Sequence, residues 1–549
     1  MTKCLIVDPA KERKAGKISF RDIPVNVYQK TVADEKGNFT KDEFLRIYRD
    51  MLVVREFETM LLLIKTTGEY EGIAYNHPGP AHLGIGQEAA YVGQAFCLGI
   101  NDFTFGSHRS HGEILAKGLS AIEQLSDVEL MNIMKSFFDG ETFSVIEKTT
   151  KATNVKDIAI EFLLYGTLAE IWARKTGFNR GLGGSMHAFF TPFGIFPNNA
   201  IVGGSADIAT GAALYKRVNR KDGLVVCNIG DGSIGCGPVY EAMNFAAMDQ
   251  FRLLWDEEHK GGLPIIFNIF NNFYGMGGQT CGETMAYSEV ARLGAGVTPS
   301  QMHAERIDGF NPLAVIDAYR RKRRIIENDE GPVLLDVLTY RLSGHSPSDA
   351  MAYRTKEEVD MWKEIDSIVM FRKQLLDAAV ATEAELDAIE KYVKDGLLNA
   401  VKLTKDDSLS PRMDLDRNPN AIAELMFSNG HVKSMDTTRK PDVLQPKEEN
   451  SRVQQIAKKA RFAFDENGKP VSKNKVFQLR DAIFEAIIDK YYEDPTLVSY
   501  GEDVREWGGA FAVYRGLSDC IPYHRLFNAP ISEGAIVGTG VGYAMAGGR

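Results

Sequence analysis

The chain has 549 residues, of which 44% are hydrophobic and 25% are charged, and its formal net charge is −10. This length predicts two or three domains, and the acidic balance argues against a general nucleic-acid or anionic-membrane surface. Six scattered cysteines exclude a disulfide scaffold or zinc ribbon, no apolar stretch approaches membrane-spanning length, and the N-terminus lacks a signal-peptide core, so we expect a cytoplasmic enzyme.

The N-terminal part is predicted to be an arm followed by a long helix. Residues 1–39 are polar and mixed, and Thr40 with Glu43 forms a capping box. Apolar residues from Phe44 to Ile64 keep helical spacing, which we interpret as a core-facing stripe. The segment IGQEA follows at residues 85–89.

The segment FGSHRSHG (residues 105–112) places two histidines and an arginine within four residues. The planar guanidinium of Arg109 can bond two oxygens of a diphosphate, and a histidine can move protons near neutral pH. From the spacing alone, a loop of solvated cations explains the segment equally well. Residues 120–180 are predicted to be mainly helical.

The stretch Gly223–Gly278 is the most informative part of the chain. Two apolar runs, Leu224–Ile229 and Leu263–Phe270, flank a helix that begins at Pro238. Apolar runs without alternation predict neighbouring strands of a buried parallel sheet. Their carboxyl ends then lie side by side, where open α/β sheets bind ligands.

Oxygen-bearing groups follow both of these predicted strands. The carboxylate of Asp231, the amide of Asn272 and the carbonyl of Tyr274 are suitable Mg²⁺ ligands. The helix start after Gly237 would add backbone N–H groups for an anion. The sequence therefore predicts a magnesium–diphosphate site, and the alternative is a pair of tight turns after two strands.

The remaining chain contains one more strand, several helices and a second unit. Gly331–Tyr340 is predicted to be a buried strand, followed by the loop RLSGHSPSD. Residues 359–403 are predicted to be helical, and Thr382 with Glu385 forms a capping box. Residues 404–475 are polar and punctuated by proline, which is typical of a linker. A new α/β unit begins at Val476.

These motifs together resemble a known family. GDG followed by NN resembles the thiamine-diphosphate motif, and NNFYGMG is similar to the first, decarboxylating component of 2-oxoacid dehydrogenase complexes. GGSMH, AIVG and RLSGHSPSD extend the match, and from Val476 the chain resembles the start of the family's β chain, which is normally separate. Asp231 and Asn272 are 41 positions apart, wider than usual. We assign the excess to Asp249–Gly262, which we expect to be a charged surface loop.

The resemblance implies a thiamine-diphosphate-binding α/β fold, with a parallel sheet covered by helices on both faces and a partial second α/β unit. It implies an N-terminal arm at 1–39 and an alpha-like diphosphate-binding domain at 40–403. A linker at 404–475 and an incomplete beta-like pyrimidine-binding domain at 476–549 would follow.

The resemblance also implies roles for individual residues. The cofactor would be bound by His108, Arg109, Val202, Gly230, Asp231, Gly232, Ser233, Asn272, Tyr274 and Glu502. Asp231, Asn272 and Tyr274 would hold Mg²⁺. Glu533 would exchange a proton with the aminopyrimidine ring, while His111 and His345 would assist protonation and acyl transfer. A solvated surface acid is the simpler interpretation of Glu533 outside this match.

The implied reaction is oxidative decarboxylation of a 2-oxoacid, of the pyruvate or branched-chain type. The acyl group would pass to the lipoyl group of an acyltransferase core in a multienzyme complex. The chain would act as a homodimer or with a beta-like chain. One alternative is an acetoin-cleaving dehydrogenase component, since HRSHG with AKG is similar to such relatives. Another is a non-catalytic truncated chain, and we expect the chain alone to be inactive or nearly so.

Overall fold

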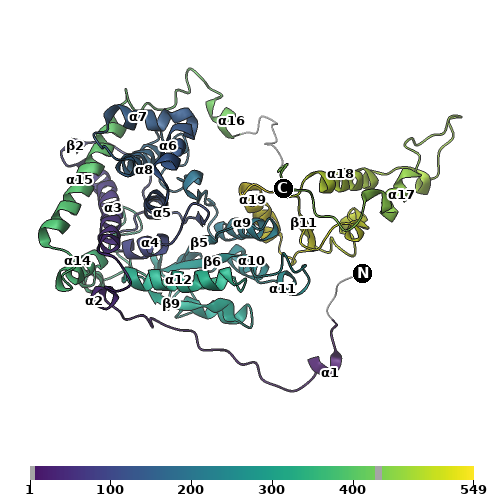
Figure 1. The fold of residues 1–549 in the computed structure, drawn as a ribbon, viewed down its shortest axis with the longest axis horizontal. Coiled ribbons are helices and arrows are strands. Elements are labelled where there is room, and N and C mark those ends of the chain that lie inside the picture. The colour runs from purple at the N-terminus through teal and green to yellow at the C-terminus, as the bar shows by residue number, and fades with distance from the viewer. Residues whose placement is uncertain (1–5, 427–435) are drawn as a thin grey trace.

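The computed structural model describes residues 6–426 and 436–549, and its centre is a six-stranded sheet (Figure 1). The strand order is β4-β3-β5-β6-β10-β9, and every neighbouring pair is parallel. The strands are β3 (Phe103–Phe105), β4 (Ile195–Phe196), β5 (Val225–Gly230), β6 (Ile265–Asn271), β9 (Glu305–Asp308) and β10 (Val333–Leu338). The two apolar runs predicted to be neighbouring strands are β5 and β6, so that prediction is confirmed.

Helices cover both faces of this sheet, as the sequence predicted. Successive strand residues point to opposite faces, so Val226 and Ile266 join one hydrophobic cluster while Val225 and Phe267 join the other. The first cluster includes α3 (Lys41–Thr66), α4 (Glu88–Ala95), α5 (Ser110–Gln124), α8 (Val155–Ile171) and α12 (Pro312–Glu327). The second includes α9 (Ser205–Val218) and α10 (Gly237–Ala246). Burial on both faces explains why the strands are apolar without alternation.

The predicted helices begin close to their predicted positions. Both capping boxes are present, Thr40 with Glu43 at α3 and Thr382 with Glu385 at α15 (Glu383–Lys405). The predicted helical regions contain α6 (Asp127–Ser136), α7 (Glu141–Thr149), α13 (Lys356–Glu364) and α14 (Ser367–Asp377). Two short hairpins, β1–β2 (Glu69–Tyr70, Ile73–Ala74) and β7–β8 (Tyr274–Gly275, Gly278–Gln279), complete this part.

The N-terminal arm begins away from the main sheet, with α1 in an extended and exposed segment, and reaches the edge of the sheet near Val25 (Figure 1). After α1 (Pro9–Glu12), Val25 makes a parallel bridge to Arg306 in the edge strand β9. The short helix α2 (Val32–Glu35) then contacts α14. The arm therefore covers the backbone of an edge strand that would otherwise be exposed.

The C-terminal unit has its own small core beside the main sheet (Figure 1). It contains α18 (Leu479–Glu493), the parallel pair β11 (Ser499–Gly501) and β12 (Leu526–Asn528), and α19 (Glu533–Met545). Helix α17 (Ser451–Ala457) contributes the buried Ile456 to this core. Part of the segment expected to be a linker thus packs with the C-terminal unit, whereas α16 (Ala421–Met426) precedes it.

Glycines bring α9 and α19 into backbone contact. A Cβ atom on Gly211 would lie 1.9 Å from the carbonyl oxygen of Thr539, and one on Gly542 would lie 1.8 Å from that of Ile208. Any larger residue at these two positions would force the helices apart. This contact joins the C-terminal unit to the helix that follows the AIVG segment.

The expectation of a charged surface loop at Asp249–Gly262 is wrong in part. The segment contains α11 (Gln250–Leu253), and Phe251 and Trp255 are each 1% exposed. Both rings pack against Phe527 of the C-terminal unit. Asp249, Glu257 and Glu258 of the segment are exposed, which is why its composition suggested a loop in solvent.

Across residues 6–426 and 436–549, none of the helices combines the length and apolar character that crossing a membrane would require.

Candidate active site

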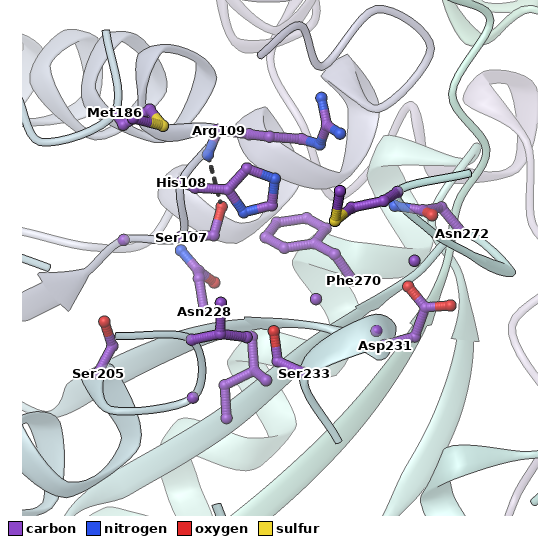
Figure 2. Close-up of a pocket in the computed structure, with 18 of the residues that line it drawn as sticks. Ser107, His108, Arg109, Met186, Ser205, Asn228, Asp231, Ser233, Phe270 and Asn272 are labelled. Carbon is purple, nitrogen blue, oxygen red and sulfur yellow. Dashed lines mark hydrogen bonds between the residues drawn. The ribbon is translucent and has the colours of Figure 1, made fainter. Parts of the chain in front are cut away.

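A cavity of about 670 Å³ opens at the carboxyl ends of β5 and β6. Segments far apart in the chain line it, and Figure 2 shows His108 and Arg109 across the cavity from Asp231 and Ser233. The lining includes Gln87, Tyr91, Ser107, His108, Arg109, Met186, Ile201, Val202, Asn228, Gly230, Asp231, Gly232, Ser233, Asn272, Tyr274 and His345. The position matches the ligand site expected for an open α/β sheet.

Asp231 follows β5 and is almost fully buried. Its Oδ2 accepts a hydrogen bond from Thr280 Oγ1 at 2.5 Å, and the nearby backbone N–H of Asn272 favours the charged carboxylate. Oδ1 is buried and has no hydrogen-bond partner among the described residues. Burial raises the pKa of this carboxyl, and the hydrogen bonds oppose that rise. A bound cation would satisfy the unpartnered oxygen.

The turn after β6 folds over the turn after β5. Asn272 donates from Nδ2 to Gln87 Oε1 at 3.3 Å, and its Oδ1 accepts from the backbone N–H of Tyr274 at 3.3 Å. A Cβ atom on Gly232 would lie 2.9 Å from the Cα of Gly275, so the close approach of the two turns requires glycine. The arrangement places Asp231 beside Asn272, as the sequence predicted.

Two buried arginines lie near this turn pair. Arg109 donates from Nη1 to the carbonyl oxygens of Leu83 at 2.6 Å and His345 at 3.2 Å. Arg341 is 1% exposed, and its Nε and Nη1 atoms have no partner among the described residues. Burial, followed by the charge of Arg341, lowers the pKa of Arg109 to about 9. Within the described chain neither guanidinium forms an ion pair with a carboxylate, so an anionic ligand suits the site.

Three histidine rings gather beside Arg109. The ring centroid of His82 lies 5.1 Å from that of His108 and 4.7 Å from that of His345. Burial and nearby positive charges, Arg109 first among them, lower the pKa of His82 and His345 to about 4 and that of His108 to about 2. The three rings are therefore neutral at pH 7.

The proton on His345 can be assigned from its neighbour. Arg109 Nη2 lies 3.1 Å from His345 Nδ1, and a guanidinium can only donate. Nδ1 must therefore accept, and the single proton of the neutral ring is on Nε2. His345 can therefore donate a hydrogen bond or a proton from Nε2.

His111 lies behind the cavity rather than in its lining. Its ring is fully buried on α5, where Nδ1 is 2.9 Å from Glu58 Oε1 and Nε2 is 2.7 Å from Ser185 Oγ. These two hydrogen bonds connect the FGSHRSHG segment to GGSMH and to helix α3. The expected catalytic role of His111 stays a prediction.

The two acids expected from the C-terminal unit are exposed and do not line the cavity. Glu533 is the first residue of α19, whose backbone N–H at Ala535 donates to Glu241 Oε2 of α10 at 2.9 Å. Glu502 follows β11. Apart from His111, the other expected site residues, from His108 to His345, do line the cavity.

Several site residues had no assigned role in the sequence. Gln87 accepts from Asn272 and Thr339, and it belongs to the IGQEA segment. Asn228 accepts from Gln94 at 2.6 Å and from Asn268 at 3.0 Å, and a polar residue inside the apolar run of β5 was a detectable signal. His82 and Arg341 had no such local signal.

Comparisons with known proteins agree with this architecture. The profile of the family described as "Dehydrogenase E1 component" matches residues 152–411, and that described as "Transketolase, pyrimidine binding domain" matches residues 475–549. The pyruvate dehydrogenase E1 component subunit alpha of Rickettsia conorii is 31% identical over 379 residues, which covers 68% of this chain and 95% of that relative. The corresponding subunit of Rhizobium meliloti is 30% identical over 397 residues, covering 72% of this chain and 95% of the relative.

Acidification should charge the histidine cluster and destabilise the protein. An unfolded histidine titrates near about 6.5, whereas burial and Arg109 lower the pKa of folded His345 to about 4. The unfolded chain therefore binds more protons between these values, and stability falls as pH decreases from about 6.5 to about 4. We expect the His345 ring to stay neutral at pH 5.5 in an NMR titration. A midpoint at or above 6.5, assigned through His345→Ala, would contradict the assignment.

Proposed function

This chain belongs to the dehydrogenase E1 component family, and on that premise we propose that it decarboxylates a 2-oxoacid oxidatively with thiamine diphosphate and Mg²⁺. The substrate is of the pyruvate or branched-chain type, as the names of the alpha-subunit relatives support. The acyl acceptor is the lipoyl group of a partner acyltransferase in a multienzyme complex.

The observation that carries this proposal is the pairing of an unsatisfied buried carboxylate oxygen with buried cations. Asp231 Oδ1 lacks a partner within the described chain, and Arg341 lacks partners at Nε and Nη1. A metal–diphosphate fits this setting, because the cation takes the carboxylate and the phosphate oxygens take the guanidinium of Arg109, which lines the cavity, while the buried charge of Arg341 lies behind the lining. Asp231, the Asn272 amide and the Tyr274 carbonyl would hold Mg²⁺, while His108, Arg109 and Ser233 would contact the diphosphate.

Thiamine diphosphate, when bound, supplies the carbon that attacks the keto group of the substrate. The chain orients that group and handles protons around it. Val202 would contact the aminopyrimidine ring through its backbone, and Glu533 would hold a proton at a nitrogen of that ring, with Glu502 nearby. His345 would donate its Nε2 proton toward the substrate, since Arg109 occupies Nδ1. His111 would act through Ser185 and the surrounding loop.

Removal of Asp231 should abolish the metal-dependent part of cofactor binding. We expect Asp231→Ala to weaken thiamine diphosphate binding in Mg²⁺ at least about tenfold, because a charge-assisted contact is worth about 1.5–3 kcal/mol. Isothermal titration calorimetry with and without Mg²⁺ measures this. Asp308→Ala is the matched control, since Asp308 ends the edge strand β9 and does not line the cavity. Equal affinity in Asp231→Ala and Asp308→Ala would remove the metal assignment.

Substrate preference should separate the proposed reaction from its alternatives. The chain would be assayed with Mg²⁺, thiamine diphosphate and an artificial electron acceptor, against pyruvate, branched-chain 2-oxoacids, 2-oxoglutarate and acetoin. One arm uses the chain alone, and one adds a beta subunit of the same family. We expect dye reduction with pyruvate or a branched-chain 2-oxoacid in the second arm. Dye reduction with acetoin but with none of the 2-oxoacids would contradict the proposed function. The absence of dye reduction with every 2-oxoacid would contradict it as well.

A further inference from the structure

The segment Asp249–Gly262 lies on the crossover that connects β5 to β6, between α10 and the start of β6. Asp231 begins this crossover and Asn272 directly follows β6, so the segment lies between these two residues in the chain. Figure 1 places α11 at the side of the sheet from which the C-terminal unit extends. We name Asp249–Gly262 the docking segment.

The docking segment buries two aromatic rings against the C-terminal unit. The ring centroids of Phe251 and Trp255 lie 6.1 Å and 5.5 Å from that of Phe527 in β12. Gln250 Nε2 donates to the carbonyl oxygen of Asn528, the last residue of β12, at 2.7 Å. Because Phe251 and Trp255 are each 1% exposed, this contact removes both large side chains from water.

A polar cluster lies beside these rings. Both histidines donate from Nδ1 to the carboxylate of Asp256, His259 at 2.6 Å and His524 at 2.9 Å. Their rings are stacked with centroids 3.6 Å apart and an interplanar angle of 9°. His524 Nε2 also lies 3.5 Å from Asp442 Oδ2. The docking segment, the chain before α17 and the C-terminal unit therefore meet at the ring of His524.

The composition of this cluster is that of a metal site, but its geometry is not. An ion bound to two imidazoles lies close to the plane of each ring. The rings of His259 and His524 are nearly parallel, with centroids 3.6 Å apart, so no position near their nitrogens lies in both ring planes. Both oxygens of Asp256 already accept Nδ1–H groups. The cluster is a hydrogen-bonded joint between two parts of the chain.

We propose that the docking segment positions the C-terminal unit on the diphosphate-binding half, with Trp255 as the packing anchor and Asp256 as the polar anchor. The neighbouring contact between α9 and α19 is made through glycines and backbone atoms, and through the ring of Tyr543 against Tyr215. The docking segment adds a second contact with large side chains, at β12.

The same crossover also reaches the start of α19. Glu241 of α10 accepts the backbone N–H of Ala535, two residues from Glu533. The crossover that presents Asp231 thus holds the C-terminal unit at α19 and at β12. The consequence for catalysis rests on the proposed function, in which Glu533 acts at the cavity, whereas docking itself does not depend on it.

Hydrogen exchange measured by mass spectrometry on the full chain tests the proposal without any assay of catalysis. In Trp255→Ala we expect amides of α19 and β12 to exchange at least about tenfold faster, while those of β5 and β6 keep their protection. Trp255→Phe should restore protection, because it retains an aromatic ring against Phe527. Trp172→Ala is the matched control, since Trp172 is also 1% exposed but stacks on Tyr75, in the diphosphate-binding half.

Unchanged exchange of α19 and β12 in Trp255→Ala would overturn the proposal, as would an equal increase in Trp172→Ala. If Trp255→Ala does not fold, Asp256→Ala gives the same test, because the Asp256 side chain is 43% exposed and its loss removes only the joint. Where the wild type is active, kcat should fall in Trp255→Ala and recover in Trp255→Phe. Faster exchange in Trp255→Ala, with a wild type that stays inactive on every 2-oxoacid even with an added beta subunit, would support docking and count against the proposed function alone.

Discussion

The parallel register between β5 and β6 is the constraint on which the site depends. Gly230 pairs with Phe270, so the two strands end at the same level and their turns meet. The backbone N–H of Asn272 then reaches the carboxylate of Asp231, and Gly232 touches Gly275. A slip of one residue would turn Asp231 toward the opposite face and fill the cavity with apolar side chains. The apolar core on both faces of the sheet fixes this register.

Around Asp231 and Asn272 the chain buries two positively charged arginines that it does not pair with carboxylates. Arg109 is held by backbone carbonyls, and Arg341 keeps two unpartnered nitrogens in the described structure. Burying a cation without a counter-ion costs stability, and the same unfavourable burial lowers the pKa of Arg109. The same environment keeps the neighbouring histidines neutral. A diphosphate with its cation would relieve this strain, so ligand binding and folding stability are linked in this cavity.

The elements that could be predicted from the sequence are those set by local pattern. Apolar runs identified β5 and β6, capping boxes located α3 and α15, and the residues after each strand indicated the position of the cavity. What could not be predicted depends on contacts between distant segments. His82 joins the site through tertiary packing alone, and Trp255 is buried although charged residues surround it in the chain. The placement of Glu533 likewise depends on how two units dock.

In the proposed function, Asp231, Asn272 and Arg109 together form a metal–diphosphate site. A crystal structure of the full chain grown with thiamine diphosphate and Mn²⁺ in place of Mg²⁺ would test this site, because anomalous scattering locates the metal without reference to any assumed chemistry. We expect one Mn²⁺ coordinated by the Asp231 carboxylate and the Asn272 amide oxygen, with diphosphate oxygens in contact with Arg109. Mn²⁺ ordered away from Asp231, or a diphosphate bound without Arg109, would contradict it.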